Sequence, residues 1–350
     1  MCQLDEEVVR VEPMVTEPQV LRAGEPGDER GRSVASPAAL VRTVSRSPTR
    51  IALARLRRDR VAMICAAICA AYVLIAIFAP LLARVEGQNP SELHQSLIDE
   101  FGFPTIGPTG EHWFGVEPRL GRDLFARWVY GARPSLIVAV AVTTITTIIG
   151  VVVGLVAGFS GGWVDRVLSW LIDLVLSLPY LLFAIASSAV LVAIFGGADG
   201  AGSEDVAQIR FISLICVLSF FGWASLARLV RGQVLSLRER EFVAAAKVLG
   251  IPTRQVLFKE LLPNLVAPIV VSVSLALPGY VVAEAGLTVL GAGLIEPTPS
   301  WGLTISAATT YYRADPLYLW LPVLGITILV LALSLLGDAV RDAFDPRTRR

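Results

Sequence analysis

Long apolar runs separated by polar segments dominate the pattern of this chain. Six of these runs are long enough to cross the hydrocarbon core of a bilayer as helices, for which about 20 apolar residues suffice. They cover residues 61–83, 135–158, 167–195, 211–230, 264–295 and 317–337. The pattern therefore predicts an all-α membrane protein with six transmembrane helices.

Two of the six runs are longer than one simple span. The run 167–195 contains Pro179, which predicts a kinked or tilted helix because proline removes a backbone hydrogen bond. The run 264–295 contains Pro278-Gly279. We expect a broken helix there, lining a cavity, because irregular backbone at membrane depth is tolerated in such a place.

Three glycines follow one another at four-residue spacing in the run 135–158. Gly150, Gly154 and Gly158 lie on one face of a helix, and that face has no side chains. This spacing predicts that another helix packs closely against it, and it says nothing about a substrate.

Three polar segments lie outside the predicted spans. Residues 1–50 mix charges with Pro and Gly and have no apolar period, so we expect a disordered tail. Residues 84–134 form the largest external segment, and residues 231–262 form a charged island between two apolar runs. The six spans make one transmembrane domain over residues 51–347.

Composition and charge agree with a membrane protein. Hydrophobic residues make up 54% of the chain and charged residues 17%, whereas soluble domains average about 45–50% and about 25%. A net charge of zero argues against a nucleic-acid partner. Basic residues gather before the first run and in the island 231–262, while the loop 296–316 has only Arg313. By the positive-inside rule, the island and both termini lie in the cytoplasm.

The island 231–262 predicts an amphipathic helix over residues 239–249. Ser236 and Glu239 have the spacing of a capping box, which marks the start of a helix. The apolar face then consists of residues at helical spacing, namely Phe242, Ala246 and Leu249.

A tight turn follows this helix. Gly250 tolerates positive φ and ends the helix, and Thr253 begins a second helix that runs into Pro263.

This arrangement of helix, glycine turn and helix resembles the EAA loop of ABC-importer permease subunits. Further motifs support the likeness, namely Arg-Glu-Arg-Glu-Phe-Val (238–243), Leu-Leu-Pro-Asn (261–264), Pro-Ser-Trp-Gly (299–302), Leu-Gly-Asp-Ala-Val-Arg-Asp-Ala-Phe-Asp-Pro-Arg (336–347) and Leu-Gly-Arg-Asp-Leu-Phe-Ala-Arg (120–127). Together they are similar to the C-type subunit of the dipeptide/oligopeptide/nickel branch, over residues 52–347.

One position departs from the family's loop. The Glu-Ala-Ala that names it is Ala244-Ala245-Ala246 here, so its acidic contact is absent or moves to Glu241, one helical turn earlier. The resemblance implies that the residues that couple this chain to an ATPase are Glu241, Ala244, Ala245, Ala246, Gly250 and Pro263.

The resemblance also implies a fold, a location and a set of partners. The fold is that of a type I importer permease in the inner membrane, with a cytoplasmic coupling helix. The partners are a homologous B-type permease, two ATPases that bind ATP and Mg²⁺, and an external solute-binding protein. The chain itself needs no cofactor. We expect it to pass peptides, while dipeptide, oligopeptide and nickel all stay open because specificity lies largely in the binding protein.

The chain contains no motif that predicts an enzyme. It has no phosphate-cradling Gly-x-x-x-x-Gly-Lys-Ser/Thr and no nucleophile with a plausible base. A stand-alone secondary transporter or channel is the alternative function. Such transporters usually have broken helices in matched positions of two repeated halves. Only the run 264–295 shows a strong break, so the pattern favours ATP-coupled transport.

Two acidic residues lie inside predicted spans, where each costs about 2.5–3.5 kcal/mol at mid-bilayer. Asp173 and Glu284 therefore either face the aqueous pathway or form a structural hydrogen bond to a neighbouring helix or partner subunit. His94 and His112 lack regular ligand spacing. We interpret them as ordinary surface or interface residues and expect no metal site.

Overall fold

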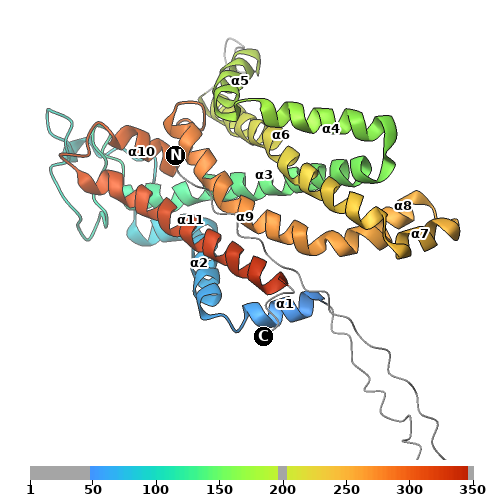
Figure 1. The fold of residues 1–350 in the computed structure, drawn as a ribbon. Coiled ribbons are helices and arrows are strands. Elements are labelled where there is room, and N and C mark those ends of the chain that lie inside the picture. Colours follow the sequence, from blue (N-terminus) through green and yellow to red (C-terminus); the bar gives the residue numbers. More distant parts are fainter. Residues whose placement is uncertain (1–47, 196–202, 346–350) are drawn as a thin grey trace, which may run out of the picture. The chain divides into compact units, whose positions relative to one another are not determined.

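The computed structural model describes residues 48–195 and 203–345, most of which are helical (Figure 1). The predicted tail lies outside these ranges, except for residues 48–50, which open helix α1 (Pro48–Leu56). The other elements are α2 (Arg60–Glu86), the 3₁₀ turn η1 (Gln95–Leu97), α3 (Leu124–Ser160), α4 (Gly162–Ser177), α5 (Tyr180–Phe195), α6 (Ser203–Arg238), α7 (Glu241–Val248), α8 (Thr253–Gln255), the π-helical turn η2 (Val256–Leu261), α9 (Leu262–Val289), α10 (Trp301–Ala308) and α11 (Pro316–Phe344).

Five continuous helical stretches of the described chain are long and apolar enough to cross a membrane. They are α2, α3, α6, the stretch Thr253–Val289 and α11. Helices α4 and α5 complete a sixth span only if they are counted together, because the chain bends by 88° between them. Leu178 has extended backbone at this bend, as the ring of Pro179 requires of the preceding residue. The kink predicted for this span is a sharp break.

The close helix contact predicted from the glycines is confirmed, and α6 is the partner of α3. A Cβ atom at Gly154 would lie 2.7 Å from the carbonyl oxygen of Ala227 and 2.7 Å from the Cβ atom of Val230. A Cβ atom at Gly158 would lie 2.7 Å from the Cβ atom of Val234. The two long helices therefore pack backbone to backbone and form the centre of the described unit (Figure 1).

The break predicted at Pro278-Gly279 is wrong. Helix α9 continues through both residues and ends only at Val289, where Gly291 follows at a φ of 79°. Proline in a membrane helix removes one hydrogen bond without ending the helix, because neighbouring groups satisfy the freed carbonyl. Pro278 is buried inside the helix bundle.

The predicted capping box is also wrong. Helix α6 extends past the apolar run to Arg238, so Ser236 lies in its last turn and caps nothing. The reason is packing, because Val234 on this extension is fully buried in a cluster with Leu155 of α3. The segment predicted to be external differs from its predicted bounds 84–134, since α2 continues to Glu86 and α3 begins at Leu124.

Candidate functional site

Helix α7 has one buried side that fixes it to the helix bundle. Val243 and Ala246 point into a cluster with Val234 of α6, Leu155 of α3 and Leu261 of η2. The packed side differs from the predicted apolar face, because Phe242 is 39% exposed and Leu249 is 76% exposed.

Gly250 ends α7 as the sequence predicts, at a φ of 69°. The Gly250 N–H donates to the Lys247 carbonyl at 3.0 Å, and the Ile251 N–H donates to the Ala246 carbonyl at 3.1 Å. This pair of bonds is a Schellman motif, and Ile251 and Ala246 complete it by packing in one apolar cluster. The turn is therefore rigid although it is exposed.

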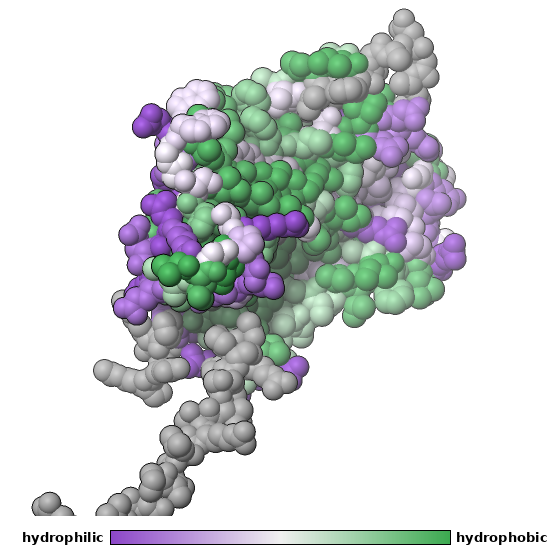
Figure 2. All heavy atoms as spheres, turned by 90° about the vertical axis from the view of Figure 1, so that its right-hand side faces the viewer, coloured by the Kyte–Doolittle hydropathy of each residue, from purple (hydrophilic) through white to green (hydrophobic). Residues whose placement is uncertain are grey.

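The other side of α7 is exposed and apolar at its tip. Val248 is 88% exposed and Leu249 is 76% exposed. Figure 2 looks onto the end of the molecule that carries α7 and α8, where apolar side chains gather beside hydrophilic ones. Exposed apolar side chains that lie together are typical of a surface that contacts lipid or another molecule.

The remaining residues predicted for coupling are also exposed. Glu241, Ala244 and Ala245 are exposed on α7, and Glu241 forms no ion pair with any described residue. Pro263 is exposed at the start of α9. Since Pro263 has no N–H, the preceding turn widens into the π-helical η2, a feature that the sequence analysis did not predict.

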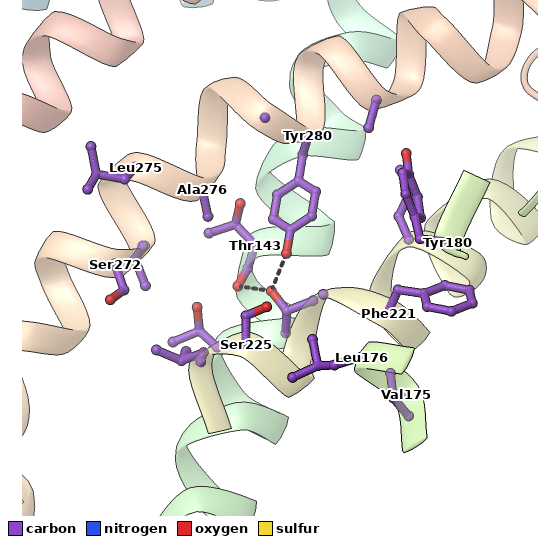
Figure 3. A pocket seen from close by; sticks show the side chains of 18 of the residues that line it. Thr143, Val175, Leu176, Tyr180, Phe221, Ser225, Ser272, Leu275, Ala276 and Tyr280 are labelled. Atoms are coloured by element: carbon purple, nitrogen blue, oxygen red, sulfur yellow. Dashed lines mark hydrogen bonds between the residues drawn. The ribbon is translucent and has the colours of Figure 1, made fainter. Parts of the chain in front are cut away.

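A cavity of about 820 Å³ lies between α3, the α4–α5 bend, α6 and α9 (Figure 3). Its lining combines apolar side chains with hydroxyl groups, and among the described residues it includes no Asp, Glu, Lys, Arg or His. The hydroxyl groups belong to Thr143, Thr146, Thr147, Tyr180, Ser225, Ser272 and Tyr280. The sequence analysis missed these residues, although the i, i+3, i+4 spacing of the three threonines within an apolar run puts their hydroxyls on one face.

Asp173, one of the two pathway candidates, does not line this cavity. Its carboxylate accepts a hydrogen bond from Arg228 Nη2 of α6 at 2.6 Å. Closer to the α6 C-terminus, Asp165 accepts from Arg231 Nε at 2.6 Å. The two ion pairs hold α4 against α6 beside the cavity.

Glu284, the second candidate, is fully buried and also absent from the cavity lining. Ser135 Oγ of α3 donates to its carboxyl group at 2.6 Å, and Thr288 Oγ1 donates at 3.2 Å. Thr288 Oγ1 in turn accepts from the Leu294 N–H at 3.1 Å. Glu284 thus connects α3, α9 and the loop that follows α9.

At the end of the bundle away from α7, several charged side chains form a network of ion pairs. Glu296 accepts from Arg122 Nη2 at 3.0 Å and from Arg127 Nη2 at 2.7 Å, and Arg122 also pairs with Glu117. Burial raises the pKa of the Glu296 carboxyl, but the charges of Arg127 and Arg122 outweigh burial and hold this pKa below its ordinary value. The network ties the segment 87–123 to the loop between α9 and α10.

The two histidines lie together at this end, with ring centroids 4.9 Å apart. His112 Nδ1 lies 2.9 Å from Asp123 Oδ2, and Asp123 Oδ1 caps α3 by accepting from the Ala126 N–H. Within residues 48–195 and 203–345, no group of three or more His, Cys, Asp or Glu side chains is arranged to hold a metal ion.

Helices long and apolar enough to span a membrane, arranged around a cavity that carries hydroxyl groups, with a short helix exposed at one end, are typical of a permease. Two family models match the chain. Residues 150–350 match the binding-protein-dependent transport system inner membrane component, and residues 47–96 match the N-terminal TM domain of oligopeptide transport permease C. The chain therefore belongs to the family of inner-membrane components of binding-protein-dependent transport systems.

Curated relatives agree with this assignment over most of their length. The dipeptide transport system permease protein DppC of Alkalihalophilus pseudofirmus is 37% identical, over 87% of this chain and 91% of its own. The oligopeptide transport system permease protein OppC of Bacillus subtilis is 33% identical (85% and 90%), and the glutathione transport system permease protein GsiD of Salmonella typhimurium is 36% identical (87% and 92%). The resemblance to C-type subunits and the predicted all-α type I permease fold are confirmed.

Proposed function

We propose that this chain is the C-type permease of an ATP-driven peptide importer and forms the translocation pathway with a homologous B-type permease. Two ATPase subunits, which bind ATP and Mg²⁺, attach on the cytoplasmic side, and an external solute-binding protein delivers the substrate. The peptide class is drawn from the relatives, whose names refer to dipeptide, oligopeptide and glutathione transport. None of them is named as a stand-alone transporter or channel.

In this proposal, α7 and both termini are cytoplasmic, and the segment 87–123 is external. The distribution of charge supports this topology, because basic residues are abundant before α2 and between α6 and α9 but sparse in the loop 296–316.

The exposed apolar tip of α7 is the observation that carries the proposal. Val248 and Leu249 suit an apolar groove on an ATPase subunit, while Val243 and Ala246 keep α7 bound to its own bundle. A displacement of α7 would pass through the rigid Gly250 turn and η2 into α9. Since α9 lines the cavity with Ser272 and Tyr280, movement at the tip changes the shape of the cavity.

The cavity at α3, α6 and α9 is this chain's share of the pathway. A volume of about 820 Å³ falls within the range of about 300–1,000 Å³ that holds small ligands. The pairs Asp173–Arg228 and Asp165–Arg231 lie beside it and hold its α4 wall.

Uptake of trialanine into proteoliposomes tests the proposal. The complete importer should accumulate the peptide only with ATP on the cytoplasmic face and the binding protein on the other, and removal of the ATPases should abolish uptake. Uptake by the lone chain under a proton gradient would instead support a secondary transporter.

A further inference from the structure

Serine and threonine hydroxyls on the spanning helices differ in whether they have a protein partner. Several hydroxyls outside the cavity bond to carbonyls of their own helix. Thr144 Oγ1 donates to the Val140 carbonyl at 2.7 Å, and Ser274 Oγ donates to the Val271 carbonyl at 2.9 Å. This is the usual way in which a helix satisfies such groups.

Inside the cavity, most hydroxyls lack a protein partner. The side-chain hydroxyls of Thr147, Tyr180, Ser225 and Ser272 have no hydrogen bond to any other described residue. The exceptions are Thr146 Oγ1, which donates to the Thr143 carbonyl, and the Tyr280 hydroxyl, which donates to Thr146 Oγ1. Thr143 Oγ1 is buried without a partner, on a residue that is only 6% exposed. Figure 3 shows Thr143, Ser225, Ser272 and Tyr280 around one open space. The cavity therefore offers unused donors and acceptors to whatever passes through it.

We infer that this hydroxyl lining binds the amide backbone of a short peptide with uncharged side chains and selects against side-chain charge. The inference rests on the proposed function and deepens it by naming the substrate class. A hydroxyl both donates and accepts, so it matches the alternating N–H and C=O groups of a peptide in any register.

The absence of charge from the described lining sets the selectivity. Every peptide has charged termini, so these do not discriminate between substrates, but an additional side-chain charge finds no counter-ion among the lining residues. A divalent cation should bind to the cavity even more weakly, because the described lining has no carboxylate or imidazole to replace the water molecules around the ion. The cavity thus favours neutral peptides over both charged peptides and Ni²⁺.

Paired substitutions in the complete importer test the inference, with trialanine uptake per ATP hydrolysed as the readout. We expect Ser272→Ala and Thr147→Val to lower this ratio roughly two- to ten-fold, the value of one lost hydrogen bond each. Ser274→Ala and Thr144→Val are the matched controls, since they remove a hydroxyl from the same helices outside the cavity and should leave the ratio unchanged. The inference would be overturned if Ser274→Ala lowered the ratio as much as Ser272→Ala, and Thr144→Val as much as Thr147→Val.

A second arm adds a charge to the cavity. Relative to the wild type, Ser225→Asp should raise the uptake of Ala-Lys-Ala over trialanine by roughly three-fold or more and lower that of Ala-Glu-Ala, whereas Ser225→Asn should change neither. Comparing each variant with the wild type cancels the preference of the binding protein. Unchanged ratios in Ser225→Asp, or ATP-driven uptake of free Ni²⁺ by the wild type at the rate of trialanine, would contradict the inference. A wild-type importer without ATP-dependent peptide uptake would overturn the proposed function as well.

Discussion

Gly250 has a φ of 69°, a conformation that side chains oppose, and no atom lies within 4 Å of a Cβ built there. We predict that Gly250→Ala costs about 1 kcal/mol of local stability through backbone strain alone. Gly250→Val adds bulk at the α7 tip. Because the cost is local, the complex should still insert and assemble, but it should hydrolyse ATP with less uptake per ATP.

Gly87→Ala is the matched control for this prediction. Gly87 also has a positive φ, 91°, and no atom within 4 Å of its Cβ position, but it ends α2 and lies far from α7 in the sequence. Undiminished uptake per ATP in Gly250→Val would show that the loop is a plain connection.

Glu296 makes the network opposite α7 sensitive to acid. Its carboxyl has a pKa below the ordinary value, so its contribution to stability is complete above about pH 4.3 and is lost as the pH falls through the lowered pKa. We predict that Glu296→Gln lowers the melting temperature by roughly 1–3 °C at pH 7 and has less effect near pH 3. Thermal unfolding of the purified protein in detergent measures this, and an effect of equal size at both pH values would argue against the ion pairs.

Single residues differ in how far the sequence predicts their role. Gly250 was predictable because its conformation depends on its immediate neighbours. The free hydroxyl of Ser272 was not, because it differs from the bonded hydroxyl of Ser274 only through the surrounding helices. His94 and His112 are likewise brought together by the tertiary fold.

At the scale of elements, the α3–α6 pair depends on close backbone approach. Gly154→Ala places a methyl group 2.7 Å from the Ala227 carbonyl oxygen, so we predict a loss of about 1–3 kcal/mol through overpacking. Gly232→Ala on α6 is the control, because no atom lies within 4 Å of its Cβ position and alanine favours helix. Thermal stability in detergent should fall for the first variant only; equal stability of both would mean that the helices separate easily.

The two prolines in overlong spans show what the pattern of an element leaves open. Pro179 ends α4 and gives a bend of 88°, whereas α9 continues through Pro278. Both remove a hydrogen bond, but the outcome depends on whether neighbouring helices hold the chain in line. The sequence therefore predicts the position of a weak point and not whether the helix breaks there.

At the scale of the whole molecule, topology is testable by labelling. After replacement of the native cysteines, single cysteines at Ser203 and Ser236, the two ends of α6, should react from opposite sides of the membrane with an impermeant reagent. Both residues are exposed, so access does not limit the reaction. Equal labelling of both from outside would refute the cytoplasmic placement of α7.

The five long spanning helices and the turn at Gly250 followed from the sequence, because they depend on apolar run length and on local turn signals. Helix α9 lines a cavity as the run 264–295 leads us to expect, but the other walls did not follow from the sequence, because α3, α4, α5 and α6 form them together. The segment 87–123 could be recognised as polar, but its attachment through Glu117, Arg122 and Glu296 joins residues far apart in the chain.

Cross-linking from the α7 tip tests the central claim most directly. A photo-reactive cross-linker on Val248→Cys in the assembled importer should yield one main adduct, between this chain and an ATPase subunit, because Val248 is 88% exposed at the proposed contact. The same reagent on Val152→Cys, which is 48% exposed on α3 within the membrane, should give no such adduct. An importer that transports peptide but gives no ATPase adduct from Val248→Cys would contradict the account.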